Sequence, residues 1–333
     1  MNFQYSIVVC TYNPDENILK KCLDSIQQLE LTDIATEVII VDNNSHLPLV
    51  DRTYVQEFCK AVSYARVVTE NNQGLVYARI CGIEQAKGDW VIFFDDDNQV
   101  AADYIQELRK LNAAFPNVGA WGPGNITVNF IDGVDIKRER HLRPVFQERH
   151  AKNIEFASNI DWQPCYPFGT GLCVRRDILL EYASLIKSKT LTLVGRNSKG
   201  LGGGEDMQIV LVTIKKGYAA GHSPSLQVVH IIPKERLTDA YIKKLIYNNT
   251  IFYFPSHSEV FPHYLKELEK RQHGPFKFTI KVIRKVLKAY LTNNYKRTLD
   301  LIGYIGYMSG SYFALGTPIP RIVKWISKRL EIV

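Results

Sequence analysis

The chain has 333 residues, 46% of them apolar and 23% charged, so its composition is that of a globular protein and excludes an intrinsically disordered one. Its six cysteines form no CxxC pair, which argues against a zinc ribbon or a redox pair and predicts reduced thiols. The net charge of +7 comes from the end of the chain, because residues 274–333 carry eleven Lys and Arg but only two acidic residues.

Four strand-like runs open the chain and begin near Tyr5, Glu37, Tyr64 and Asp89. Between the first two, apolar residues recur at helical spacing after Asp15, a predicted N-cap. Strands that alternate with helices in this way form βαβ units, so the fold class is α/β with a mostly parallel sheet.

The fourth run ends in three consecutive acidic residues, Asp95, Asp96 and Asp97, after five large apolar residues. The apolar run has no alternation, so it predicts a strand covered on both faces. Adjacent carboxylates destabilise one another in a cleft of low dielectric constant unless a cation neutralises them. A divalent metal site is therefore predicted here, and a solvated turn is the alternative.

Polar residues follow each of the four predicted strands, as TYN (11–13), DNNS (42–45), ENNQG (70–74) and DDDN (95–98). Parallel sheets bind ligands beyond the carboxyl ends of their strands, so one crevice is expected to collect these segments. No GxGxxG turn follows the first strand and no GxxxxGK[ST] occurs, which argues against a dinucleotide fingerprint and a P-loop.

The second half contains a glycine-rich segment, residues 200–204, followed directly by Glu205 and Asp206. The glycines predict a loop that can move as a lid. The two acidic residues open a helical pattern, where carboxylates are favoured by unpaired backbone amides. They are candidates for catalysis or, more simply, for a helix cap.

Together these motifs resemble the family 2 glycosyltransferases, which are inverting enzymes of the GT-A fold. The residues that carry the resemblance are VVCTYN (8–13), VIIVDNNS (38–45), NNQGLVYAR (71–79), GDWVIFFDDDN (88–98), GTGLCVRRD (169–177), GGGED (202–206) and VVH (228–230). The resemblance implies a catalytic domain over 1–255, with a nucleotide-binding half (1–120) and an acceptor half (121–255), and a helical extension over 256–333.

The resemblance also implies how a nucleotide-sugar donor is held. Tyr12 would lie against the base, Asp42 would hydrogen-bond it and Arg79 would approach the same nucleotide, and Thr11, Asn13 and Asp96 belong to the same donor-binding set. From the residues alone, Asp42 could equally start a turn, and Tyr12 and Arg79 could be packing and ion-pair residues.

The same resemblance implies the metal ligands and the residue that acts as general base. Asp95 and Asp97 match the DxD motif that binds Mg²⁺ or Mn²⁺, and His230 would complete the site, although His222 is a competing histidine. Asp206 would be the general base, with Glu205 as the alternative. A UDP-sugar is the predicted donor, and Trp121, Trp162 and Phe168 are candidates for the acceptor pocket.

The basic tail combines an amphipathic pattern with an uncharged stretch. Apolar residues between 276 and 295 fall on one helical stripe beside a basic cluster, and residues 301–320 carry no charge. The stretch is expected to be re-entrant or interfacial, with Arg321, Lys324, Lys328 and Arg329 on an anionic membrane surface. A helical cap packed on the catalytic domain is the alternative.

The prediction is an inverting, metal-dependent glycosyltransferase that moves a sugar from a nucleotide donor to a hydroxyl of a glycan or lipid-linked saccharide in cell-surface polysaccharide synthesis. The N-terminus shows no signal peptide, which predicts a cytoplasmic protein with a peripheral position at the inner face of the plasma membrane. The alternatives are a nucleotidyltransferase and a non-catalytic sugar- or nucleic-acid-binding protein, and no nucleic-acid partner is expected.

Overall fold

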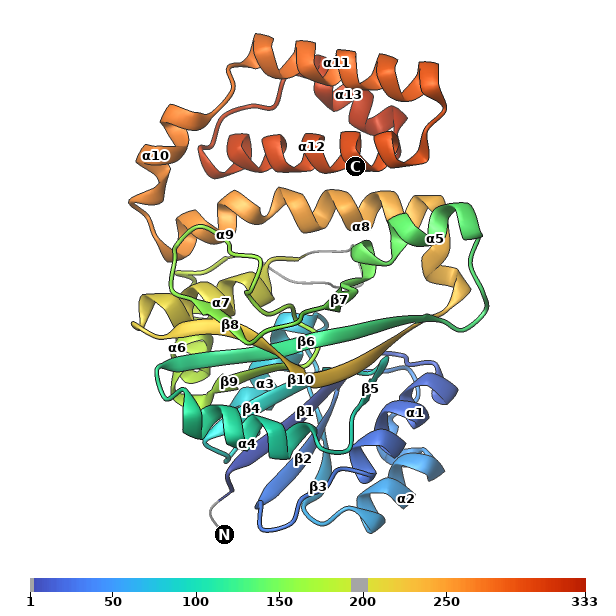
Figure 1. Cartoon of the computed structure of the whole chain (residues 1–333), viewed down its shortest axis with the longest axis vertical. Coiled ribbons are helices and arrows are strands. Elements are labelled where there is room, and N and C mark those ends of the chain that lie inside the picture. Colours follow the sequence, from blue (N-terminus) through green and yellow to red (C-terminus); the bar gives the residue numbers. More distant parts are fainter. Residues whose placement is uncertain (1–2, 193–202) are drawn as a thin grey trace.

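The computed structural model describes residues 3–192 and 203–333. Within this part of the chain, ten strands form one mixed sheet whose main path runs β3-β2-β1-β4-β9-β6-β10-β5. Figure 1 shows the sheet in the lower part of the molecule and a group of helices above it. The predicted α/β fold class is confirmed.

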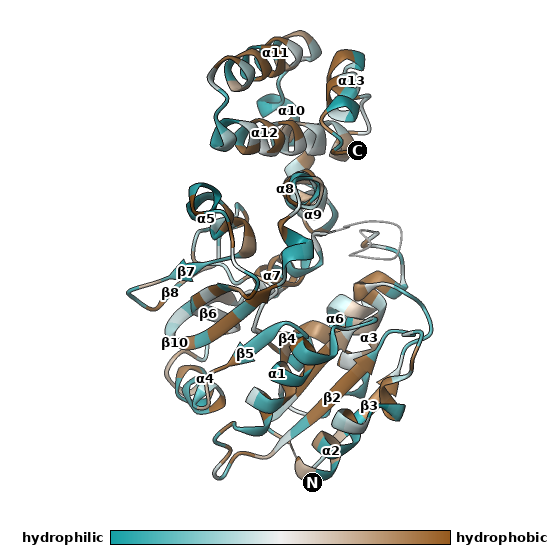
Figure 2. Cartoon of the chain, turned by 90° about the vertical axis from the view of Figure 1, so that its right-hand side faces the viewer, coloured by the Kyte–Doolittle hydropathy of each residue, from teal (hydrophilic) through white to brown (hydrophobic). Residues whose placement is uncertain are grey.

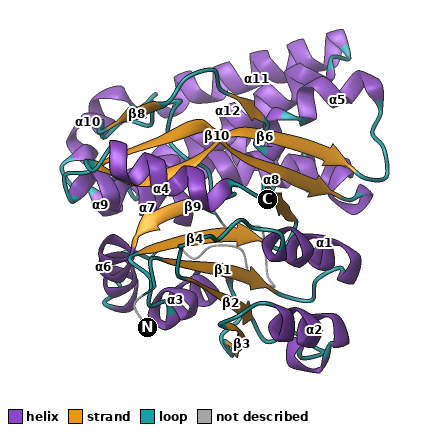
Figure 3. Ribbon diagram, turned by 60° about the horizontal axis from the view of Figure 1, so that its bottom comes forward, coloured by secondary structure: helices purple, strands orange, loops and turns teal. Residues whose placement is uncertain are grey.

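The first four strands are parallel neighbours, as their apolar runs predict. They are β1 (Tyr5–Thr11), β2 (Thr36–Asp42), β3 (Ala65–Thr69) and β4 (Trp90–Asp95), and Figure 3 shows β1, β2 and β4 running in one direction. The register pairs Thr11 of β1 with Asp42 of β2, and Cys10 of β1 with Asp95 of β4. Three of the predicted polar segments therefore leave the sheet at the same edge.

The second half adds two long strands and several short ones, and a short strand that runs opposite to its neighbours separates the long strands from β4. β9 (Leu172–Arg175) is antiparallel to β4 and to β6 (Val118–Phe130), whereas β6 is parallel to β10 (Ala219–Ile232). β5 (Asn98–Val100) pairs antiparallel with β10 and sets His230 opposite Asn98. Two short strands complete the sheet: β7 (Arg149–His150) pairs with β6 and β8 (Glu155–Ala157) with β10.

Helices cover both faces of the sheet, because successive strand residues alternate between two cores. Val8 packs in one core, and its neighbours Ile7 and Val9 pack in the other. The Val8 side is covered by α3 (Leu75–Gln85), α6 (Arg176–Lys187) and α7 (Glu205–Lys215), and the other side by α1 (Glu16–Gln27), α2 (Thr53–Ala61) and α4 (Tyr104–Ala114). Short helical segments are α5 (Ile136–Leu142), η1 (Leu49–Asp51), η2 (Pro144–Phe146) and η3 (Lys234–Leu237).

A buried carboxylate joins three strands at the other end of the sheet. Glu37 of β2 accepts hydrogen bonds from the Ser6 hydroxyl (2.7 Å), the Arg66 guanidinium (2.6 Å) and the Lys87 amide (2.6 Å). Burial would raise the pKa of Glu37, but these hydrogen bonds outweigh it and hold the pKa below its usual value. Glu37 is therefore a structural carboxylate.

The C-terminal helices form a bundle above the sheet. They are α8 (Asp239–Ile251), α9 (Tyr253–Val260), α10 (Tyr264–Arg271), α11 (Pro275–Thr292), α12 (Tyr295–Ala314) and α13 (Arg321–Arg329). In Figures 1 and 2, α12 lies between α8 and α11, and α8 lies nearest the sheet. The predicted boundary at residue 255 falls inside α9, so the helical region is better described as starting at α8.

The expectation that residues 301–320 form a re-entrant or interfacial segment is wrong. Most of this stretch is α12, whose buried residues Leu301, Ile302 and Ile305 pack in a core shared with α8, α11 and α13. Gly306 and Gly310 lie against the C-terminal turn of α8, where they contact Thr250 and Ile251. Protein packing thus explains the lack of charge, and none of the described helices is long and apolar enough to span a bilayer.

Candidate active site

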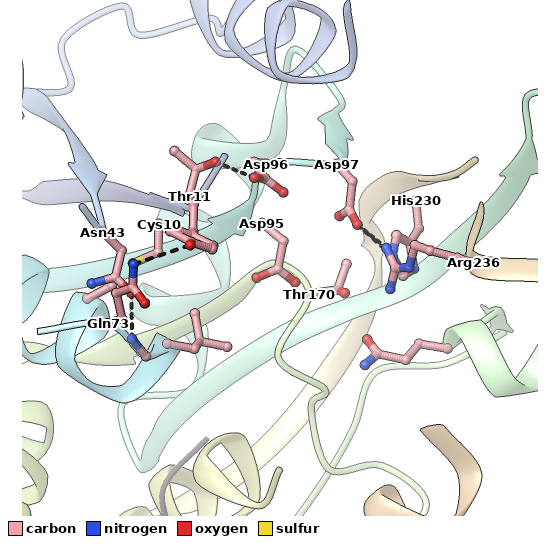
Figure 4. A pocket seen from close by; sticks show the side chains of 15 residues that line it. Cys10, Thr11, Asn43, Gln73, Asp95, Asp96, Asp97, Thr170, His230 and Arg236 are labelled. Carbon is pink, nitrogen blue, oxygen red and sulfur yellow. Dashed lines mark hydrogen bonds and ion pairs between the residues drawn. The ribbon is translucent and has the colours of Figure 1, made fainter. Parts of the chain in front are cut away.

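A cavity of about 250 Å³ opens at the carboxyl ends of β1, β2 and β4. Its lining brings together the predicted residues Thr11, Tyr12 and His230 with the acidic triplet. Figure 4 shows Asp97, His230 and Arg236 on one side of this cavity, with Thr11 and Asp96 on another and Asp95 between them. The described residues that complete the lining are Cys10, Asn43, Gln73, Gly74, Leu75, Ala78, Gln147, Thr170 and Arg236.

The acidic triplet lies in the turn between β4 and β5 and concentrates negative charge. Asp96 accepts a hydrogen bond from Thr11, whose hydroxyl is held at the end of β1. Burial, together with the nearby Asp97 carboxylate, raises the pKa of Asp96 to about 7. The surroundings of Asp96 therefore disfavour its charged form.

Asp97 has the opposite surroundings. The Nε2 of His230 lies 3.3 Å from Asp97 Oδ2, and Arg236 forms an ion pair with the same oxygen. Burial would raise the pKa of Asp97, but His230 and Arg236 hold it well below its usual range. His230 reaches this position through the pairing of β10 with β5, and its Nδ1 lies 2.9 Å from the Phe146 carbonyl.

Arg79 joins Asp95 of the acidic triplet to Glu205, the residue next to the predicted base Asp206. Its buried guanidinium lies 3.8 Å from Asp95 and 3.9 Å from Glu205. Burial would lower the pKa of Arg79, but Glu205 and then Asp95 outweigh it and raise the pKa. Asp206 accepts a hydrogen bond from the Gly169 amide at 3.1 Å. Glu205 and Asp206 both occupy the first turn of α7, so their backbone orientation is fixed by a helix.

The loops after β1 and β2 form the opposite wall. The ring of Tyr12 is 38% exposed, and its hydroxyl accepts a hydrogen bond from Gln73 at 3.2 Å. Asn43 holds the neighbouring loop, because its Oδ1 accepts a hydrogen bond from the Gly74 amide at 2.7 Å. An exposed aromatic ring beside amide groups is suited to a flat polar ligand such as a nucleotide base.

The family model described as Glycosyl transferase family 2 matches residues 6–182 of the sequence, more than half of the chain. The chain belongs to glycosyl transferase family 2. This family assignment favours the predicted glycosyltransferase over a nucleotidyltransferase.

Two curated relatives match this family 2 chain over short regions. One is the putative glycosyltransferase EpsH of Bacillus subtilis, 32% identical over 105 residues, which are 32% of this chain and 29% of EpsH. The other is the glycosyltransferase GlyA of Streptococcus pneumoniae, 31% identical over 105 residues, which are 32% of this chain and 14% of GlyA. The matched regions therefore span less than a third of either relative.

A solved structure agrees with the fold. The mannosyltransferase PcManGT from Pyrobaculum calidifontis, in complex with GDP-Man and Mn²⁺, is similar with a TM-score of 0.55 at 15% identity over 94% of this chain and 87% of that one. At this identity the likeness confirms the GT-A fold.

Several predicted site residues of this family 2 protein lie outside the cavity lining. Asp42 is buried, and its two carboxylate oxygens accept the Ser45 and Leu49 amides at 2.9 Å each. The structure thus shows the turn role, and base recognition by Asp42 stays a prediction. Asn13 is exposed and hydrogen-bonds to Ser45 and His46. Arg79, Glu205 and Asp206 also lie outside the cavity lining.

The positions of the predicted histidines and aromatic residues can be compared with the cavity. His230 lines the cavity, whereas His222 does not and instead lies 3.1 Å from the Cys165 carbonyl. Trp121 is fully buried beside Phe115 and Phe156, so its predicted place in an acceptor pocket is wrong. Trp162 packs against Tyr166, and Arg149 lies over the ring of Phe168. In the predicted lid, residues 200–202 lie outside the described part of the chain.

Thr170, Gln147 and Arg236 are among the cavity residues to which the sequence analysis gave no individual role. Thr170 is buried, and its hydroxyl has no hydrogen-bond partner among the described residues. Its signal was the GTGL motif, where a polar residue interrupts an apolar segment. Gln147 has φ of 69°, an unusual conformation that only the structure reveals. Arg236 follows His230 by six residues, and nothing in the sequence linked the two.

The predicted three-ligand metal site is only partly assembled. Asp97 and His230 face each other, whereas Asp95 is engaged with Arg79. Over residues 3–192 and 203–333, no three His, Cys, Asp or Glu side chains are grouped so that they could hold a metal ion by themselves. One carboxylate and one imidazole do match a site in which a substrate supplies further ligands, as Mg²⁺ sites with bound phosphates do.

Proposed function

We propose that the protein transfers a sugar from a nucleoside diphosphate donor to an acceptor hydroxyl with inversion at the anomeric carbon. The observation that carries this proposal is the cavity, because its lining combines three aspartates, His230 and Arg236 with the exposed Tyr12. Such a site has a charged end for a diphosphate and a flat end for a base. Family membership supports the same reaction class.

Asp97 and His230 would hold a divalent cation, Mg²⁺ or Mn²⁺, together with diphosphate oxygens. The raised pKa of Asp96 is consistent with this fit, because burial and then the Asp97 carboxylate disfavour its charged form, which a nearby cation would favour. When bound, the cation would stabilise the charge that develops on the leaving diphosphate. Thr11 would keep Asp96 in place, and Tyr12 would stack on the base, a UDP-sugar being the proposed donor.

Asp206 would act as the general base. Gly169 fixes one of its oxygens, and Arg79 holds the adjacent Glu205 and the donor-side Asp95, so one buried guanidinium ties both halves of the site together. A carboxylate that removes the proton from an acceptor hydroxyl contributes roughly 10²–10⁴-fold to such reactions. The acceptor would be a glycan or a lipid-linked saccharide of cell-surface polysaccharide synthesis.

The test separates donor binding from transfer. UDP-, GDP- and dTDP-sugars are screened with Mn²⁺ for thermal stabilisation of the full chain, since a ligand at 100 times its Kd adds about 2.7 kcal/mol. Asp97→Ala should abolish the Mn²⁺-dependent part of the shift. Asp206→Asn should keep it and lose transfer by at least about 100-fold. Full turnover by Asp206→Asn would refute the base assignment, and stabilisation by none of the donors would refute the proposal.

We also propose a peripheral position on an anionic membrane through the outer face of α11 and α13. Most of the predicted apolar stripe of α11 points away from the bundle, because Phe278, Val282 and Ala289 supply the buried side of the helix. Val286, which also belongs to the stripe, packs against the bundle core. Exposed apolar side chains on this outer face are Phe276 (79%), Ile283 (38%), Leu287 (54%), Tyr290 (84%) and Leu291 (79%) on α11 and Ile322 (50%) and Trp325 (60%) on α13.

α11 and α13 also carry basic residues. They are Lys277, Lys281, Arg284, Lys285 and Lys288 of α11 and Arg321, Lys324, Lys328 and Arg329 of α13, of which Lys285 lies over the Tyr304 ring of α12. Figure 2 shows α11 and α13 as a mixture of hydrophobic and hydrophilic segments at the end of the molecule remote from β2. Exposed apolar side chains among basic ones suit the interface of an anionic bilayer.

Vesicle co-sedimentation tests this position. Leu287→Glu and Leu291→Glu together should greatly reduce binding to vesicles that contain phosphatidylglycerol, because they place charge where acyl chains would be contacted. Leu47→Glu is the control, since Leu47 is equally exposed (62%) on the catalytic domain. Undiminished binding by the double variant would refute the assignment of this face.

A further inference from the structure

Arg236 occupies the carboxylate that the proposed cation would need. Its guanidinium pairs with Oδ2 of Asp97, the same oxygen that lies 3.3 Å from His230 Nε2. Asn98 donates a hydrogen bond to the other oxygen, Oδ1, at 2.9 Å. A metal ion bound between Asp97 and His230 therefore competes directly with Arg236 for one oxygen atom.

The surroundings of Arg236 hold the Nε end of its guanidinium but leave the terminal nitrogens able to change partners. Its Nε donates a hydrogen bond to the Tyr241 hydroxyl at 3.0 Å, and its guanidinium carbon lies 5.5 Å from the Phe146 ring centre. These rings offer a cation favourable contact without fixing one partner for the terminal nitrogens. The side chain is 17% exposed and lines the cavity, so the terminal nitrogens can turn within it.

The charge balance of the cavity shows where Arg236 would go. Among the described lining residues, Arg236 is the only Lys or Arg, against Asp95, Asp96 and Asp97. A nucleoside diphosphate adds further negative charge to this enclosed site. A divalent cation at Asp97 offsets part of it, and the displaced guanidinium can pair with a phosphate oxygen, as arginine does readily.

We propose that Arg236 exchanges partners during donor binding: it neutralises Asp97 in the free protein and binds the diphosphate once a metal ion takes Asp97. The inference rests on the proposed donor site. Its consequence is that one side chain affects the two ligands in opposite directions. Arg236 weakens the binding of the metal alone and strengthens the binding of the nucleoside diphosphate with its metal.

Isothermal titration on the full chain measures both ligands separately. For Arg236→Gln, Mn²⁺ alone should bind more tightly, by about threefold or more, because a competing cation is gone. UDP or GDP, titrated at saturating Mn²⁺, should bind at least about tenfold more weakly. Arg236→Lys should lie between wild type and Arg236→Gln for the nucleotide, because it keeps the charge but not the planar fork.

Matched controls separate exchange from structural damage. Arg138→Gln removes another partly exposed arginine, paired with Asp239 outside the cavity, and should change neither affinity. Tyr241→Phe removes the hydrogen bond to Arg236 Nε and keeps every charge, so it should preserve the tight nucleotide binding.

The outcomes are distinct. If Arg236→Gln weakens both ligands, or leaves nucleotide binding unchanged, partner exchange is refuted while the donor site stands. If the unaltered chain binds neither UDP nor GDP, the proposed donor site fails and partner exchange fails with it. Tighter metal binding together with weaker nucleotide binding supports the exchange.

Discussion

The packing of α12 on α8 provides a sharp test of the C-terminal architecture. A Cβ added at Gly310 would clash with the Ile251 carbonyl oxygen and lie 3.0 Å from the Ile251 carbonyl carbon. Both are backbone atoms of α8, so they cannot move aside as the end of a flexible side chain could. A Cβ added at Gly303, on the same helix, meets only Ile246 and Thr250 side-chain atoms at 3.7 and 4.0 Å.

The two glycines therefore give opposite predictions for the same substitution. Alanine gains about 1 kcal/mol over glycine in a helix interior, whereas overpacking costs about 1–3 kcal/mol. Gly303→Ala should raise the free energy of unfolding by up to about 1 kcal/mol. Gly310→Ala should lower it by about 1–2 kcal/mol, because the clash exceeds the helical gain.

Urea unfolding followed by circular dichroism at 222 nm measures both variants under identical conditions. Gly303→Ala serves as the matched control, since it changes helix propensity without the clash. If Gly310→Ala stabilises the protein as much as Gly303→Ala does, α12 does not lie against the end of α8. The account of the uncharged stretch as a packed helix would then fail.

Three further predictions concern the site and the sheet. Gly169→Ala should reduce transfer at least about tenfold while donor binding persists. The reason is that an added Cβ would lie 3.1 Å from an Arg79 nitrogen and 3.3 Å from Asp206 Oδ2. An equal loss of transfer and of donor binding would contradict this. Arg79→Met should cost about 3–5 kcal/mol in urea unfolding, because the buried Glu205 and the partly exposed Asp95 lose the Arg79 guanidinium, and a cost below about 1 kcal/mol would disprove that role. Glu37→Gln should cost about 1–3 kcal/mol at pH 7. The pKa of Glu37 is lowered in the folded protein, so this cost is present above the unfolded pKa of about 4.3 and should shrink as pH falls through the folded pKa. A cost that does not change between pH 7 and pH 3 would contradict the carboxylate role.

The sequence predicted the strands and helices of the N-terminal half well because the signals there are local. Uninterrupted apolar runs marked β1, β2 and β4, and Asp15 caps α1 by accepting hydrogen bonds from the Asn17 and Ile18 amides, as expected. Polar residues at the ends of parallel strands must share one edge of the sheet, so the meeting of Thr11 with Asp96 followed from topology.

The C-terminal region shows where the same reasoning fails. The apolar stripe of α11 was visible in the sequence, but periodicity says only that a face is apolar and not what covers it. The structure turns most of that stripe outward and buries Phe278 and Val282, with Val286 of the stripe packed against the same core. The uncharged stretch was assigned to a membrane because length and composition do not distinguish a lipid-facing helix from one packed among other helices.

The sequence by itself determined the α/β fold, the acidic triplet at a strand end and the family to which the chain belongs. Only the tertiary structure decided that Asp97 faces His230 and Arg236 while Asp95 faces Arg79. The reason is physical: neighbouring residues share a local pattern, but their partners are set by strand register. The pairing of β10 with β5 joins residues more than a hundred positions apart, which no local pattern specifies.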